Sequence, residues 1–188
     1  MSLKLIREAI PDMYVPTVYD VDYRGIYNMG IRYAIFDVDD TLLSSDDMVV
    51  TPTLFELFDY VQNEVGFNTC LVSNSSEKRV SPVAELLHTG YVAKARKPSS
   101  RSFRTVEQIF LDKNGPNKMV FIGDSVFLDM IYARRFQMFK VLVDSIRGNR
   151  WNLKTISNDC VHAVMKFPLK KAGFEFGKHY VKKQKNNS

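Results

Sequence analysis

The chain has 188 residues, of which 45% are hydrophobic and 25% charged, and its net charge is +5. These values are typical of one globular domain, and they do not fit a disordered or a membrane-spanning chain. With two cysteines, no long apolar run and no secretory signal, we expect a disulfide-free protein of the cytoplasm or an organelle matrix. The positive charge favours anionic partners.

The chain opens with a short, partly amphipathic segment over residues 3–10 that Pro11 ends. This segment is predicted to pack on the domain, with contact to a membrane surface as the alternative. Residues 14–27 are expected to be irregular or weakly helical, and Gly30 indicates a turn before the first strand.

The stretch Ile31–Leu42 is the centre of the prediction. It begins with apolar and β-branched residues typical of a buried strand and ends with Asp37, Asp39 and Asp40. Ligands of open α/β sheets bind at the carboxyl ends of the strands. Two neighbouring acids repel each other unless a cation lies between them, and oxygen ligands suit Mg²⁺. A carboxylate can also attack phosphorus, although taken alone the three acids could form a simple acidic turn.

Helices and strands alternate through the rest of the core. Helices are predicted over residues 51–65, 77–87, 102–111 and 128–136, and strands over 67–72, 91–93, 119–122 and 140–143. Thr51 and Pro52 begin the first of these helices, while Gly66 and Gly90 are expected to end the first and second.

The pattern weakens beyond these elements. Residues 151–165 are predicted to be helical, and residues 166–188 form a basic, partly disordered C-terminal tail. We therefore expect a single domain over residues 1–165. The alternation of strand and helix predicts a Rossmann-like, three-layer α/β/α core with a parallel sheet.

Polar residues follow four of the predicted strands, at the edge where parallel strands end together. They are Asp37, Asp39, Ser73, Asn74, Lys97, Asp124 and Asp129. Phosphoryl transfer needs a nucleophile, a cation, neutralisation of the phosphoryl oxygens and an acid for the leaving group. The set supplies each part, although a surface Lys97 or a helix-capping Ser73 would be unremarkable on its own.

This order of motifs resembles the haloacid dehalogenase (HAD) superfamily of phosphatases. The matching segments are 37–41, 73–74, 97–98 and 123–129. The resemblance implies that Asp37 is the nucleophile and that Asp39 acts first as general acid and then as base. It also implies a Mg²⁺ ion held by Asp37, Asp124 and the backbone carbonyl of Asp39.

The resemblance extends to the phosphate-binding residues. Ser73 and Asn74 would bind the phosphoryl group, and Lys97 would neutralise both that group and the nucleophile. Thr41 and Asp129 would support the site, with Asp129 orienting Lys97 or a metal-bound water.

Within the superfamily, residues 15–22, 73–80 and 94–98 resemble the YqeG branch of subfamily IIIA, which is similar to the mitochondrial phosphatidylglycerophosphatases. The likeness covers about Pro11 to Val143. Residues 42–50 and 77–96 leave no room for a sizeable cap domain. The active site should therefore be open, which suits large or membrane-held substrates or a site completed by another subunit.

The leading hypothesis is a Mg²⁺-dependent phosphomonoesterase that forms an aspartyl phosphate and acts on an anionic phospholipid head group such as phosphatidylglycerophosphate. The alternatives are a phosphatase for a soluble nucleotide, sugar phosphate or phosphoprotein, and a catalytically silent binding module on the same scaffold. Few aromatic residues accompany the basic tail, so nucleic acid is not an expected partner. Peripheral binding to an anionic membrane is a further expectation.

Overall fold

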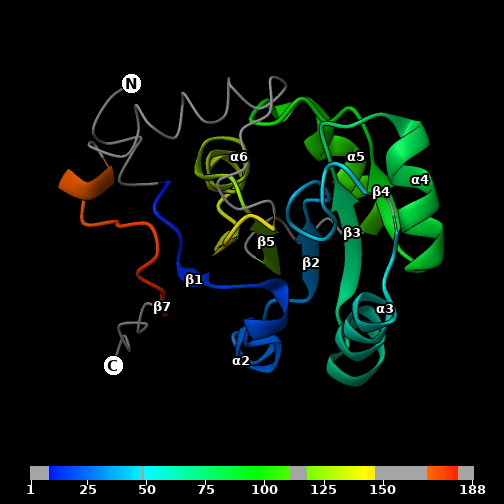
Figure 1. Ribbon diagram of the computed structural model, residues 1–188, viewed down its shortest axis with the longest axis horizontal. Helices are drawn as coiled ribbons and strands as arrows, with labels where there is room; N and C mark the ends of the chain where they lie inside the picture. The colour runs from blue at the N-terminus through cyan, green and yellow to red at the C-terminus, as the bar shows by residue number, and fades with distance from the viewer. Residues whose placement is uncertain (1–8, 48, 111–117, 147–168, 182–188) are drawn as a thin grey trace.

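The computed structural model describes residues 9–47, 49–110, 118–146 and 169–181. A seven-stranded sheet runs through it (Figure 1). Its strands are β1 (Met13–Val15), β2 (Tyr33–Phe36), β3 (Asn68–Val72), β4 (Gly90–Val92), β5 (Met119–Gly123), β6 (Phe139–Val143) and β7 (Tyr180–Val181). The strand order is β4-β3-β2-β5-β6-β1-β7, and every pairing is parallel except that of β7 with β1. The predicted α/β class with a parallel central sheet is confirmed.

Helices cover both faces of this sheet (Figure 1). They are α2 (Tyr23–Asn28), α3 (Pro52–Asp59), α4 (Glu77–Leu86), α5 (Phe103–Phe110) and α6 (Ile131–Arg135), with π-helical turns η2 (Tyr60–Val65) and η5 (Val126–Met130) and 3₁₀ turns η1 (Val18–Asp20) and η3 (Ser100–Ser102). The apolar sides of α2, α3 and α4 pack on one face, and those of α5 and α6 pack on the other. This is the three-layer arrangement that the sequence predicts.

The central strands are buried on both faces, because alternate side chains of a strand point in opposite directions. In β2, Ala34 and Phe36 join the core under α3, whereas Ile35 joins the core under α5. All three are fully buried. Burial on both faces explains why the sequence of β2 is a continuous apolar run. The same burial holds in place the strand whose end carries the acids.

The ends of two helices test the local signals in the sequence. The Thr51 hydroxyl accepts a hydrogen bond from Leu54 N at 3.2 Å, and Gly66 has a φ of 97°, so both predicted boundaries of the first helix are confirmed. The boundary predicted at Gly90 is wrong. The second helix ends at Leu86, His88 takes the left-handed conformation with a φ of 49°, and Gly90 already begins β4.

Two strands at one edge of the sheet lie outside the predicted set. Residues 13–15 pair with β6 as the short strand β1, although the sequence predicts residues 14–27 to be irregular or weakly helical. Beyond them, Tyr180 and Val181 form β7, and the side chains of Leu169 and Phe174 are each 1% exposed. The part of the expected tail that the structure describes is therefore folded onto the sheet. The predicted helix over residues 151–165 and the domain limit at residue 165 lie outside the described residues.

Candidate active site

The ends of four adjacent strands, β4, β3, β2 and β5, form the site. β2 lies between β3 and β5, with Phe36 opposite both Leu71 and Ile122. The chain leaves β2 toward β3 on one side and returns to β5 on the other, so the sheet changes direction here. Asp37 follows directly, and its backbone N–H donates to the carbonyl of Ile122 at 2.9 Å. Such a switch point is where open α/β sheets bind ligands, which places Asp37 at the expected edge.

Lys97 lies at the centre of this edge and is 4% exposed. Its Nζ atom is 2.7 Å from an oxygen of Asp37 and 2.7 Å from an oxygen of Asp129. The same ammonium lies 5.2 Å from the centre of the Phe121 ring. The structure thus brings together three residues that are far apart in the sequence and fixes the lysine between two carboxylates.

Asn74 holds the backbone that carries Lys97. Its side-chain oxygen accepts from Lys97 N at 2.6 Å, and its side-chain nitrogen donates to Lys97 O at 3.2 Å. The backbone of Ser73 accepts a further hydrogen bond from Ala95 N at 2.9 Å. The Asn74 side chain therefore contacts the loop after β4, and its expected contact with phosphate stays a prediction.

Asp124 and Asp129 follow β5. Oxygens of Asp37, Asp124 and Asp129 all lie within 4.8 Å of one another. The Thr41 hydroxyl donates to Asp124 at 3.2 Å, and the second oxygen of Asp129 accepts from Ser125 N at 3.0 Å. Both supporting residues named from the sequence, Thr41 and Asp129, are thus in contact with the acidic cluster or with Lys97.

Burial and mutual repulsion govern the charge of this cluster. Burial, reinforced by the charge of Asp129 and opposed by that of Lys97, raises the pKa of Asp37 to about 7. Burial and the neighbouring carboxylates also raise the pKa of Asp124 well above its usual range. Burial alone would lower the pKa of Lys97, but the carboxylates of Asp129 and Asp37 outweigh it and raise that pKa. The lysine is therefore cationic at neutral pH.

One buried ammonium does not balance three carboxylates, so repulsion between the acids adds to the effect of burial in raising the pKa values of Asp37 and Asp124. A divalent cation would remove this repulsion, and carboxylate oxygens are the ligands that hard cations prefer. The donor set therefore fits a divalent metal ion. Asp129 has one oxygen on Lys97 and the other on Ser125 N, so Asp37 and Asp124 are the carboxylates better able to bind it.

The Asp39 carboxylate is not part of this cluster of three acids and has its own set of hydrogen-bond donors. It accepts hydrogen bonds from the hydroxyls of Ser73 at 3.2 Å and Ser75 at 2.5 Å, and Arg79 Nε donates to its other oxygen. The sequence assigned no role to Ser75 or Arg79. One signal was available: Arg79 lies in the first turn of α4, where the helix dipole disfavours a cation unless an anion is close by.

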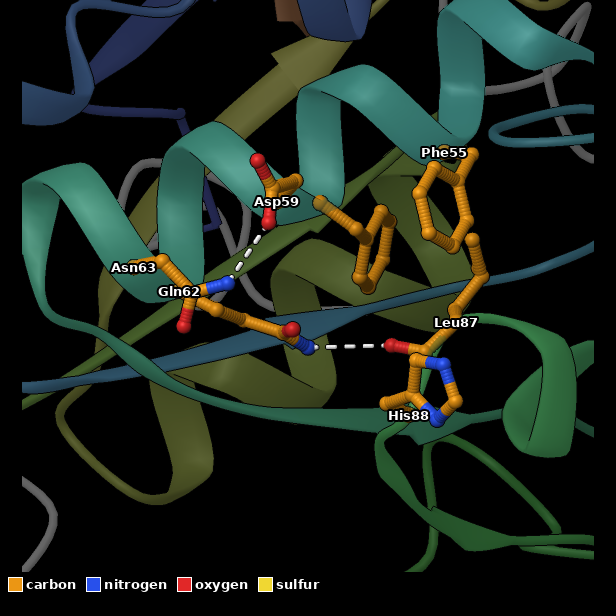
Figure 2. Close-up of a pocket in the computed structure, with 7 residues that line it drawn as sticks. Phe55, Asp59, Gln62, Asn63, Leu87 and His88 are labelled. Carbon is orange, nitrogen blue, oxygen red and sulfur yellow. Dashed lines mark hydrogen bonds between the residues drawn. The ribbon is translucent and has the colours of Figure 1, made fainter.

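Two surface pockets lie elsewhere. One, of about 380 Å³, lies between the α3–η2 helix and the end of α4 and is lined by Phe55, Phe58, Asp59, Gln62, Asn63, Leu87 and His88 (Figure 2). Two hydrogen bonds join residues that line this pocket, one from Asn63 to Asp59 and one from Gln62 to the carbonyl of Leu87. The other, of about 360 Å³, shares Phe55 and His88 with it. Neither contains a residue of the strand-end site.

Comparisons with known proteins agree with the geometry. The model of the family described as mitochondrial PGP phosphatase matches residues 2–146. Bacillus subtilis (strain 168) has a protein named "Probable phosphatase YqeG" that is 31% identical over 135 residues, covering 71% of this chain and 76% of that protein. None of the helices in the described part of the chain is long and apolar enough to cross a bilayer.

Two solved structures are similar to this one. An uncharacterised protein from Listeria monocytogenes serotype 4b has a TM-score of 0.48 and 13% identity, with 73% of this chain and 99% of that chain covered. The hypothetical protein XCC2798 from Xanthomonas campestris has a TM-score of 0.47 and 12% identity, with 84% of this chain and 92% of that chain covered.

Proposed function

This chain belongs to the mitochondrial PGP phosphatase family and is a phosphatase, and from that premise we propose that it hydrolyses a phosphomonoester on an anionic phospholipid head group. Phosphatidylglycerophosphate is the leading candidate, because it is the compound in the family's name. The observation that carries the chemistry is the buried contact of Lys97 with both Asp37 and Asp129, next to Asp124. A fixed cation beside a reactive carboxylate can hold a phosphoryl group for attack.

In the first step a carboxylate oxygen of Asp37 attacks the phosphorus atom. A bond forms between that oxygen and phosphorus, the ester bond from phosphorus to the leaving oxygen breaks, and Asp39 gives the leaving oxygen a proton. Lys97 and Ser73 neutralise and orient the phosphoryl oxygens. The 2.7 Å contact of Lys97 with Asp37 supports this role, because one ammonium can then face both reacting groups.

In the second step water releases the phosphate. Asp39, now a carboxylate, takes a proton from a water molecule whose oxygen bonds to phosphorus, and the bond from phosphorus to Asp37 breaks. The contact of Asp39 with Ser73 supports its position beside the phosphoryl site. Asp37 is then free for another turnover.

Asp37, Asp124 and the backbone carbonyl of Asp39 are the proposed ligands of the divalent cation, with Mg²⁺ as the expected ion. When bound, it supplies positive charge that lets the two acids ionise together and offsets charge on the phosphoryl oxygens. Asp129 instead positions Lys97, and Thr41 positions Asp124.

The loop after β4 supports a large anionic substrate. Buried and exposed residues alternate here: Ala95 and Lys97 are buried, whereas Lys94 and Arg96 are exposed. Both exposed residues have positive φ angles, 49° and 56°, and both lie in the loop that carries Lys97. An anionic bilayer next to an uncapped site would attract them. A soluble phosphate ester remains the second candidate, and the charges then only attract it from solution.

The proposed catalytic unit is a single domain that includes residues 169–181, since Leu169 and Phe174 are buried against it and β7 joins its sheet.

A screen of phosphate esters with Mg²⁺ tests the proposed substrate. It should contain phosphatidylglycerophosphate in mixed micelles, nucleotides, sugar phosphates and a phosphopeptide, each with the Asp37→Asn variant as control. The proposal expects the highest kcat/KM on the phospholipid. A higher kcat/KM for a soluble ester than for the phospholipid would show that the substrate is a soluble phosphate ester. Activity retained by Asp37→Asn would reject the mechanism.

A further inference from the structure

Three side chains hold the carboxylate of Asp39. Ser73 and Ser75 donate to one of its oxygens at 3.2 and 2.5 Å, and Arg79 Nε donates to the other. Ser73 follows β3 at the proposed phosphoryl site, so the contact with its hydroxyl turns the Asp39 carboxylate toward that site. The carboxylate has no freedom to rotate without losing at least one of these hydrogen bonds.

Arg79 also fixes the backbone that follows Asp39. Its Nη2 atom donates to the carbonyl of Ser44 at 2.8 Å and to the carbonyl of Asp47 at 3.1 Å. Both carbonyls belong to the segment 42–50, which connects the acidic motif to α3. One guanidinium therefore joins three things: the first turn of α4, the segment 42–50 and the carboxylate of Asp39.

The contact is too well shielded to be an ordinary surface ion pair. The side chain of Arg79 is 16% exposed and that of Asp39 is 23% exposed. Fully exposed pairs contribute little because water and salt screen them, whereas a partly buried pair with extra hydrogen bonds constrains its members. The exposed Arg24–Glu64 pair, at 59% and 61%, shows the ordinary situation in the same molecule.

We propose that Arg79 is a positioning residue for the phosphatase reaction, which holds the Asp39 carboxylate in line with the leaving-group oxygen. The inference rests on the proposed role of Asp39 in proton transfer and adds the residue on which that role depends. Arg79 touches neither substrate nor metal in this account; it acts through Asp39. Proton transfer requires the donor within hydrogen-bond reach of the leaving oxygen, so a misplaced carboxylate slows esters that need this proton.

A rival role is a purely structural tie between α4 and the segment 42–50. Loss of such a tie would reduce the turnover of every ester by the same factor. Loss of the positioning role would instead slow esters with poor leaving groups selectively, because activated aryl phosphates need little protonation. The ratio of two rates in one preparation cancels the fraction of folded enzyme, so this difference is measurable even in a destabilised variant.

The experiment measures kcat and KM for an alkyl phosphate and for p-nitrophenyl phosphate in Arg79→Gln, Arg79→Lys, Asp39→Asn and the Asp39→Asn/Arg79→Gln double variant. Lys78→Gln is the matched control, since it removes the same charge from the adjacent, exposed position of α4. We expect Arg79→Gln to lower kcat for the alkyl phosphate about tenfold more than for the aryl phosphate. Arg79→Lys should regain part of that loss, and Lys78→Gln should show no selective loss.

In the double variant, Arg79→Gln should add no selectivity to that of Asp39→Asn, because both changes disable the same proton transfer. Equal losses on both esters, additive effects in the double variant, or faster turnover of the alkyl phosphate would overturn the positioning role. If Asp39→Asn shows the selective loss and Arg79→Gln does not, only this inference fails. If Asp39→Asn itself shows none, the proposed role of Asp39 fails, and this inference fails with it.

Discussion

The ammonium of Lys97 lies 2.7 Å from a carboxylate oxygen of Asp129, and the two side chains are 1% and 0% exposed. Water cannot solvate either charge, so each depends on the other. Because the same ammonium also contacts Asp37, the position of the proposed nucleophile is tied to a residue that follows a different strand. The stability of the fold and the geometry of the site are therefore coupled at this contact.

Asp129→Asn should reduce both stability and activity. Breaking a buried ion pair typically costs about 3–5 kcal/mol, and we expect about 3 kcal/mol in the free energy of unfolding because Asp37 still contacts Lys97. Chemical denaturation measures this, with Glu64→Gln as control, since the exposed pair of Glu64 with Arg24 should contribute less than about 1 kcal/mol. An equal loss of unfolding free energy in the two variants would show that the buried contact stabilises the fold no more than the exposed pair does.

Gly123→Ala should disturb the same contact through sterics. A Cβ atom at residue 123 would lie 2.4 Å from Oδ2, 2.6 Å from Cγ and 2.8 Å from Cβ of Asp129, so the whole acidic side chain must move. We expect a stability loss of about 1–3 kcal/mol and a large fall in kcat. Gly30→Ala serves as control, because Gly30 has open space around it and only its φ of 89° is strained. Gly30→Ala should lower stability slightly and leave kcat unchanged, and a Gly123→Ala enzyme with normal kcat would contradict the account.

Metal binding should depend on pH through the acids. Burial raises the folded-state pKa of Asp37 from 3.8 to about 7, so the metal-free fold favours its protonated form. A raised pKa contributes stability that is complete below about pH 4 and is lost as the pH rises through about 7. Mg²⁺ must displace these protons. Thermal unfolding should therefore show a larger Mg²⁺-induced increase in Tm at about pH 8 than at about pH 6, and an equal increase at both would contradict this assignment.

The exposed cations beside the site should favour anionic membranes. The double variant Lys94→Gln/Arg96→Gln removes two charges, each worth about 1 kcal/mol near an anionic surface. Liposome co-sedimentation at low salt should show at least about tenfold weaker binding for this variant, with high salt weakening the wild type similarly. Turnover of p-nitrophenyl phosphate should be unaffected. Wild-type protein that stays in the supernatant with anionic liposomes at low salt would instead favour a soluble substrate.

Much of this site could be predicted from the sequence, because its residues follow strands that each have a strong signal. Asp37 follows an apolar run, and Asp124 follows another, so their convergence needs only the rule that parallel strands end at one edge. The register of these strands then determines which side chains are neighbours.

Other features depend on contacts that have no local signal. β1 and β7 are three and two residues long, and their pairing depends on the neighbouring edge rather than on their own pattern. The end of α4 at Leu86 is followed by His88, which takes the left-handed conformation although it is not glycine. The contact of Arg79 with Asp39 joins residues 40 positions apart, and only the unfavourable place of a cation in the first turn of a helix indicated it.

The central claim is that Asp37 becomes phosphorylated during turnover. Acid-quenched enzyme, taken within a single turnover of phosphatidylglycerophosphate and analysed by peptide mass spectrometry, tests it most directly. We predict a phosphoryl group on the peptide that contains Asp37, absent from Asp37→Asn and accumulating in Asp39→Asn with an aryl phosphate, where hydrolysis of the intermediate is slowed. Full turnover with no phosphorylated peptide, or with phosphate on another residue, would contradict the account.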